Sequence, residues 1–64
     1  MVIRKKDVKA LIERAKQSLN EDDPSYLLLQ SYIKAAEDML PDIKGTLNSA
    51  QQEVYDRLEI AVGP

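Results

Sequence analysis

The fold of this chain is decided by residues 24–40, which read PSYLLLQSYIKAAEDML. At about 100° per residue, the apolar side chains of this stretch cover roughly half of a helical cylinder, more than the stripe of an ordinary surface helix. We therefore expect a central helix over residues 24–40 that is contacted from more than one side. Its apolar side chains are Tyr26, Leu28, Leu29, Tyr32, Ile33, Ala35, Ala36, Met39 and Leu40.

Narrower apolar stripes at helical spacing predict a helix on either side of the central one. The stripe of residues 7–19 follows Asp7, which we expect to cap that helix, and consists of Val8, Leu11, Ile12, Ala15 and Leu19. The stripe of residues 49–62 follows Ser49 and Gln52, which resemble a capping box, and consists of Ala50, Val54, Leu58, Ala61 and Val62.

The connections between these helices are short. Asp23 is expected to cap the central helix with Pro24 at its first position, and the turn before it is short enough to make the first two helices antiparallel. Residues 41–47 read as a loop or one broken turn that Ile43 and Leu47 tie inward, with Gly45 as a stop. Gly63 and Pro64 end the last helix.

The predicted fold class is therefore all-α: a single domain over residues 1–64, forming a small up-down-up three-helix bundle, or a helical hairpin plus a third helix. A chain of 64 residues buries a thin core, and this one has no Cys or His with which to form a disulfide or bind zinc. We expect self-association to complete the bundle.

The composition argues against catalysis. Without His and Cys, the commonest general base and thiol nucleophile are missing, and the two glycines cannot form a phosphate-binding loop. The acidic turn Glu21, Asp22 and Asp23 lacks the spacing of a calcium loop and reads as a solvated capping turn. We expect no enzyme activity, no cofactor and no metal, and a cytoplasmic protein without a membrane partner.

Charge is distributed unevenly along the chain. Residues 1–19 hold six basic and two acidic side chains, a balance of +4, whereas residues 20–64 hold three basic and nine acidic ones, a balance of −6. Lys5, Lys9 and Lys16 form one row on the first helix, spaced to contact successive phosphates. The acidic later helices would repel a nucleic-acid backbone, so the alternative is a solvated face that attracts those helices.

Two aliphatic residues interrupt otherwise polar helix faces. Leu27 and Ile60 are expected at the same end of an up-down-up bundle, with Tyr26 close by and the acidic turn of Glu21, Asp22 and Asp23 beside them. Exposed aliphatic groups next to an aromatic ring are typical of a protein-binding patch. The alternative is incidental exposure, because single exposed leucines are common.

One edge of the central helix exceeds what two narrow neighbours can cover. Tyr32, Ala35 and Met39 lie within about 60° of each other on the helical wheel, and the small Ala35 would let a partner helix approach closely. We interpret this edge as a self-association surface. The alternative is contact with the other helices of the same chain.

Together these features predict a small non-enzymatic regulator or inhibitor that binds another protein and occludes its surface. The acidic turn favours a partner with a basic surface. We expect the regulator itself to form a homo-oligomer. The format suits the stand-alone inhibitors that bacterial viruses encode. The alternatives are a structural subunit of a larger assembly and a nucleic-acid-associated protein that uses its basic first helix.

Overall fold

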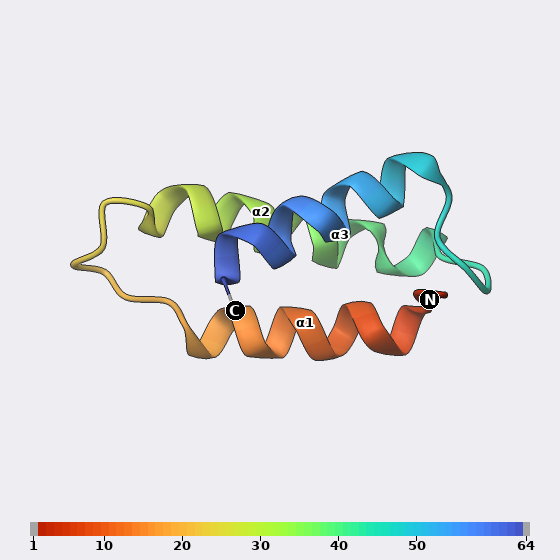
Figure 1. The fold of residues 1–64 in the computed structure, drawn as a ribbon, viewed down its shortest axis with the longest axis horizontal. Helices are drawn as coiled ribbons and strands as arrows, with labels where there is room; N and C mark the ends of the chain where they lie inside the picture. Colours follow the sequence, from red (N-terminus) through yellow and green to blue (C-terminus); the bar gives the residue numbers. More distant parts are fainter. Residues whose placement is uncertain (1, 64) are drawn as a thin grey trace.

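The computed structural model describes residues 2–63, which form three α-helices and one 3-10 turn. The elements are α1 (Lys5–Gln17), α2 (Tyr26–Met39), η1 (Leu40–Asp42) and α3 (Ser49–Val62). Helix α2 runs antiparallel to α1 and α3, and all three helices pack against one another (Figure 1). The all-α, up-down-up bundle predicted from the sequence is confirmed for the described residues. Pro64, predicted to end the last helix together with Gly63, lies outside them.

The core lies between the three helices and is mostly aliphatic. Val8 and Leu58 have no exposed surface at all, so α1 and α3 meet at the centre of the bundle. Helix α2 contributes Leu29, Ile33 and Ala36. The remaining buried apolar side chains are Ile3, Leu11, Ile12, Ala15, Ile43 and Tyr55.

The segment before α1 closes one end of the bundle. Arg4 pairs with Thr46 in an isolated antiparallel bridge, which places the chain before α1 against the loop before α3. Ile3 and Ile43 are both buried beneath this contact, as expected for Ile43, and Leu47 is half-buried. Gly45 has a φ of 81°, which the loop requires for its reversal and which favours glycine.

Helix α1 begins and ends two residues earlier than predicted. Asp7 is not the N-cap: it lies in the first turn, where its carboxylate accepts a hydrogen bond of 2.9 Å from the backbone N–H of Arg4, the actual N-cap. An acidic residue stabilises a helix from either place, so the residue type alone does not fix the start. The helix ends at Gln17, where the Ser18 hydroxyl donates to the carbonyl of Arg14 at 3.1 Å.

Helix α2 is shorter than predicted at its start. Asp23 and Pro24 belong to the preceding turn, because the Asp23 carboxylate accepts from the backbone N–H of Ser25 at 2.8 Å and thereby makes Ser25 the N-cap. At the other end, α2 gives way to η1 at Leu40, next to Pro41, as the sequence predicts.

Helix α3 has the predicted bounds but a different capping pair and a rotated inner face. The reciprocal hydrogen bonds join Asn48 and Gln51, at 2.8 and 3.0 Å, rather than Ser49 and Gln52. The inner face is formed by Gln51, Tyr55 and Leu58, whereas the predicted core residues Ala50 and Ala61 are exposed. Turning Tyr55 inward removes far more apolar area from water than burying an alanine would.

Candidate protein-binding surface

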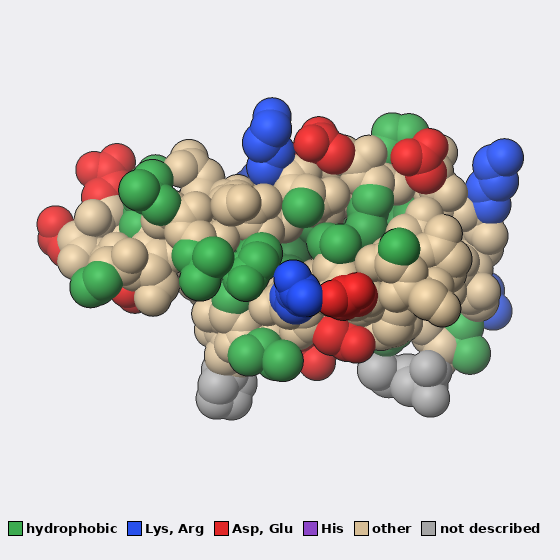
Figure 2. Space-filling view, turned by 90° about the horizontal axis from the view of Figure 1, so that it is seen from above, with side chains coloured by type: hydrophobic (Ala, Val, Ile, Leu, Met, Phe, Trp, Pro, Cys, Tyr) green, Lys and Arg blue, Asp and Glu red, His purple; other side chains and the backbone are tan. Residues whose placement is uncertain are grey.

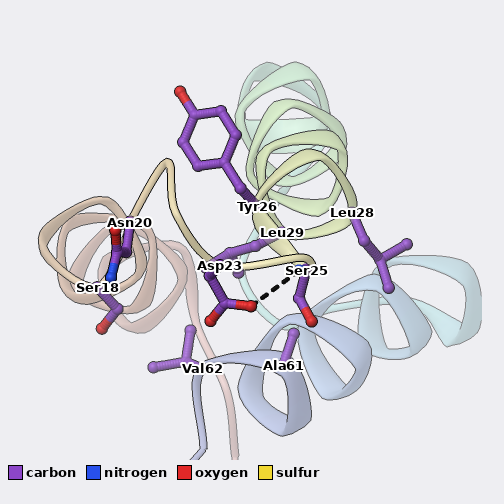
Figure 3. A pocket seen from close by; sticks show the side chains of 9 residues that line it. All are labelled: Ser18, Asn20, Asp23, Ser25, Tyr26, Leu28, Leu29, Ala61 and Val62. Carbon is purple, nitrogen blue, oxygen red and sulfur yellow. Dashed lines mark hydrogen bonds between the residues drawn. The ribbon is translucent and has the colours of Figure 1, made fainter.

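A hollow of about 230 Å³ lies where the turn between α1 and α2 meets the last turn of α3 (Figure 3). One side of it is polar, formed by Ser18, Asn20, Asp23 and Ser25, and the other is apolar, formed by Tyr26, Leu28, Leu29, Ala61 and Val62. The hollow therefore combines residues 18–29 with two residues near the end of α3, and no single stretch of sequence defines it.

Local hydrogen bonds hold the polar side of the hollow in place. The Asn20 side chain accepts from the backbone N–H of Asp22 at 3.0 Å, and the Asn20 carbonyl accepts from that of Asp23 at 2.9 Å. One oxygen of the Asp23 carboxylate accepts from Ser25, as the dashed line in Figure 3 shows. Because short polar side chains fix their own backbone in this way, the Asp23 carboxylate is held at the edge of the hollow, pointing toward α3.

The hollow is electrostatically negative. Among residues 2–63, Asp23 supplies the only full charge that lines it, and the exposed Glu21 and Asp22 stand next to it in the same turn. The guanidinium of Arg14 donates to the carbonyl of Gly63 at 3.3 Å and lines another hollow, beside Glu59 and Ile60. The predicted acidic turn thus contributes to the polar side of a hollow whose other side is apolar.

An apolar band continues from this hollow along the seam between α2 and α3, where Figure 2 shows hydrophobic side chains gathered on the surface. On α2 the band includes the predicted self-association residues Tyr32 and Met39, which are half-buried, and Ala35, which is exposed. Leu28, one of the apolar side chains of the predicted central helix, is 55% exposed and links the band to the hollow. These four side chains share one face, within about 60° on the helical wheel.

The structure separates Leu27 from Ile60. Leu27, 74% exposed, lies over the groove between α1 and α2 together with Leu19 and Ile33. Ile60, 80% exposed, lies on the outer side of α3 beside Glu59. Of the predicted pole, the structure therefore brings Tyr26 and Asp23 together in one hollow and places Leu27 and Ile60 on other faces.

Sequence reasoning missed Leu28 and Ala61 as surface residues next to the hollow. The signal available was the run of three leucines at residues 27–29, which spans about 200° of a helix and so cannot be buried whole. Which leucine is exposed depends on where α1 and α3 pack, and the run itself carries no information about that.

The predicted phosphate-contact row on α1 is not uniform. Lys16 forms an ion pair with Glu37 of α2 at 2.9 Å, and this hydrogen bond and the charge of Glu37 raise the pKa of the Lys16 amine. Lys9 is exposed and Lys5 is half-buried. One of the three amines therefore already has an anionic partner within the bundle.

Tyr55 is a core residue whose environment alters the pKa of its phenol. It is buried among Leu11, Ala10 and Arg14, and burial raises the pKa of its phenol, with the nearby carboxylates of Glu59 and Asp7 acting in the same direction. The phenol therefore keeps its proton near neutral pH, and its position in the core indicates a packing role.

The remaining chemistry of the surface is sparse. Among residues 2–63, no three His, Cys, Asp or Glu side chains converge to hold a metal ion. No helix in the same range has the length and hydrophobicity needed to cross a membrane. Comparisons with protein-family models, with curated proteins and with solved structures found no match to this chain.

Proposed function

We propose that this protein is a small non-enzymatic regulator or inhibitor that binds another protein and occludes its surface. The observation that carries the proposal is the apolar band from Leu28 to Met39, which opens at one end into a hollow with a carboxylate. Surface of this kind favours a macromolecular partner, because removing it from water supplies binding free energy.

The hollow and the acidic turn are the proposed contact with the partner. Tyr26 and Leu28 supply apolar area at its edge, and Glu21, Asp22 and Asp23 would steer a partner with a basic surface. Leu27 and Ile60 remain predicted contact residues. Leu27 lies over the groove between α1 and α2, and Ile60 lies on the outer side of α3. A cytoplasmic setting fits the absence of cysteine.

The seam between α2 and α3 is the proposed self-association surface. Ala35 is the smallest side chain of the band and would let the α2 helix of a second copy approach closely, between Tyr32 and Met39. Pairing two such faces in a two-fold dimer leaves a hollow near each end of the α2 pair. A dimer of this form would present two partner-binding sites.

Adjacent leucines on α2 provide a matched test of the partner contact. We expect Leu28→Asp to abolish capture of the protein's binding partner from an extract of the native host, because an unpaired carboxylate is introduced beside the hollow. Leu27→Asp, an equal change about 100° around the same helix, tests the predicted role of Leu27 in the same assay. Circular dichroism checks that both variants keep their helical content.

The captured partner is then purified and its affinity measured with each variant by isothermal titration calorimetry. Binding that survives Leu28→Asp unchanged would rule out the hollow and its edge as the contact. A captured partner that is nucleic acid, with binding lost on Lys9→Ala, would instead favour the nucleic-acid alternative. The Lys16–Glu37 ion pair weighs against that alternative, because it occupies one of the three lysines.

A further inference from the structure

We infer that the hollow between the α1–α2 turn and the end of α3 receives an arginine side chain of the partner protein. This inference rests on the proposed function, since it names the chemistry by which the partner would be held. It also names an arginine side chain as the basic group of the partner, and it can be tested without knowing the partner's identity.

The size of the hollow fits one side chain. Its volume of about 230 Å³ is below the roughly 300 Å³ at which pockets for whole small-molecule ligands begin. Its apolar wall is formed by Leu29, Ala61 and Val62, which would cover the three methylene groups of an arginine stem. An apolar side chain would fill the same wall but would bury the Asp23 carboxylate against it without a partner.

The polar side of the hollow fits a guanidinium. One Asp23 oxygen is engaged by Ser25, and the other accepts no hydrogen bond from residues 2–63. The Ser18 hydroxyl uses its proton on Arg14 and keeps its acceptor lone pairs, so a second acceptor stands at the edge of the same hollow. A guanidinium carries five donors in a planar fork and can satisfy both groups.

Charge complementarity favours this occupant over others. No lysine or arginine lines the hollow among the described residues, and two further carboxylates stand in the adjoining turn. A divalent cation would need several oxygen ligands, and the part of the chain that the structure describes offers a single carboxylate here. An anionic group, such as a phosphate or an acidic side chain, would be repelled by Asp23.

A pair of small probes tests the inference directly. ¹⁵N-labelled protein is titrated with N-acetyl-arginine amide and, separately, with N-acetyl-citrulline amide, which has nearly the same shape but no charge. We expect saturable shifts of the backbone amides of Ser25, Leu28 and Val62 with the arginine probe. The citrulline probe is expected to bind at least fivefold more weakly.

Two variants separate charge from shape. Asp23→Asn keeps an oxygen that can accept from Ser25 but removes the charge, and we expect it to weaken arginine binding at least fivefold. Asp38→Asn removes the same charge from an exposed position on α2 that does not line the hollow, and is expected to leave binding unchanged. Ala61→Phe fills the hollow and should abolish binding while leaving every carboxylate in place.

Equal shifts with the two probes, equal binding by Asp23→Asn, or no shift at millimolar arginine would overturn the inference. The proposed function fails separately, if Leu28→Asp leaves partner capture intact. A result in which Leu28→Asp loses the partner while the arginine probe gives no shift would reject the arginine hollow and retain the protein-binding role.

Discussion

A matched pair of leucine truncations tests the rotation of α2 and α3 on which the exposed band depends. Leu58 is fully buried, so Leu58→Ala removes its transfer free energy and leaves a cavity, which together destabilise a protein by about 2–5 kcal/mol. Leu28 is 55% exposed, so Leu28→Ala removes less than half of that transfer term and leaves no enclosed cavity, which corresponds to about 1 kcal/mol or less.

These magnitudes are large relative to the stability of so small a domain. At roughly 0.05–0.15 kcal/mol per residue, a chain of 64 residues has a free energy of unfolding of about 3–10 kcal/mol. We therefore expect Leu58→Ala to leave the protein marginally folded and Leu28→Ala to leave it clearly folded. Urea unfolding followed by circular dichroism at 222 nm, at low protein concentration, measures both free energies.

Equal losses from the two truncations would refute the reasoning, because they would mean that Leu28 is buried as deeply as Leu58. A second refuting pattern is a larger loss for Leu28→Ala than for Leu58→Ala at concentrations where the protein is monomeric. Raising the protein concentration distinguishes self-association from burial, since only a contact between copies makes the effect of Leu28→Ala depend on concentration.

Two further predictions concern the core and its edges. Gln51→Ala should lower the free energy of unfolding by about 1–2 kcal/mol, because it removes the capping pair with Asn48 and a 3.3 Å hydrogen bond to the Asp42 carbonyl, whereas Ser49→Ala should change it little; urea titration measures both. The raised pKa of Tyr55 means that its contribution to stability is fully present below pH 10.0, the ordinary phenol value, and is lost as the pH rises through the folded-state pKa. The melting temperature should therefore fall above pH 10, and Tyr55→Phe should reduce that fall; an equal fall in the variant would contradict the burial of the phenol.

The helices could be predicted from the sequence because each is encoded locally. The spacing of Val8, Leu11, Ile12 and Ala15 matches the period of a helix, whatever the rest of the chain does. Pro41 ends a helix through the geometry of its own ring, which also needs no distant contact. The cap of α3 does not follow from the residue types alone, since Asn48 with Gln51 and Ser49 with Gln52 fit the same pattern one residue apart. A tertiary contact favours the pair of Asn48 and Gln51, because the Gln51 side-chain amide also donates to the Asp42 carbonyl of η1.

The site could be predicted only in part, because it depends on how the helices rotate against each other. The sequence predicts the acidic turn and Tyr26 as partner contacts and the edge of Tyr32, Ala35 and Met39 as a self-association surface, and both stay predictions. Their neighbour Ala61 comes from the far end of the chain and was assigned to the core, since its spacing with Leu58 matches a helical stripe. Burial of Tyr55 rotates the inner face of α3 so that Ala61 is exposed while Leu58 stays buried. This preference for the larger side chain depends on how three helices share one core, which the spacing of residues within one helix does not show.

The most direct test is the mass of the protein in solution. On the proposed function, a second protein surface covers the apolar band on α2, and in the purified protein the only such surface is another copy. We predict that sedimentation equilibrium gives twice the 7.2 kDa chain mass at high concentration, with dissociation on dilution, and that Ala35→Glu gives the chain mass throughout. A single 7.2 kDa species for the unaltered protein up to millimolar concentration would contradict the self-association of this surface.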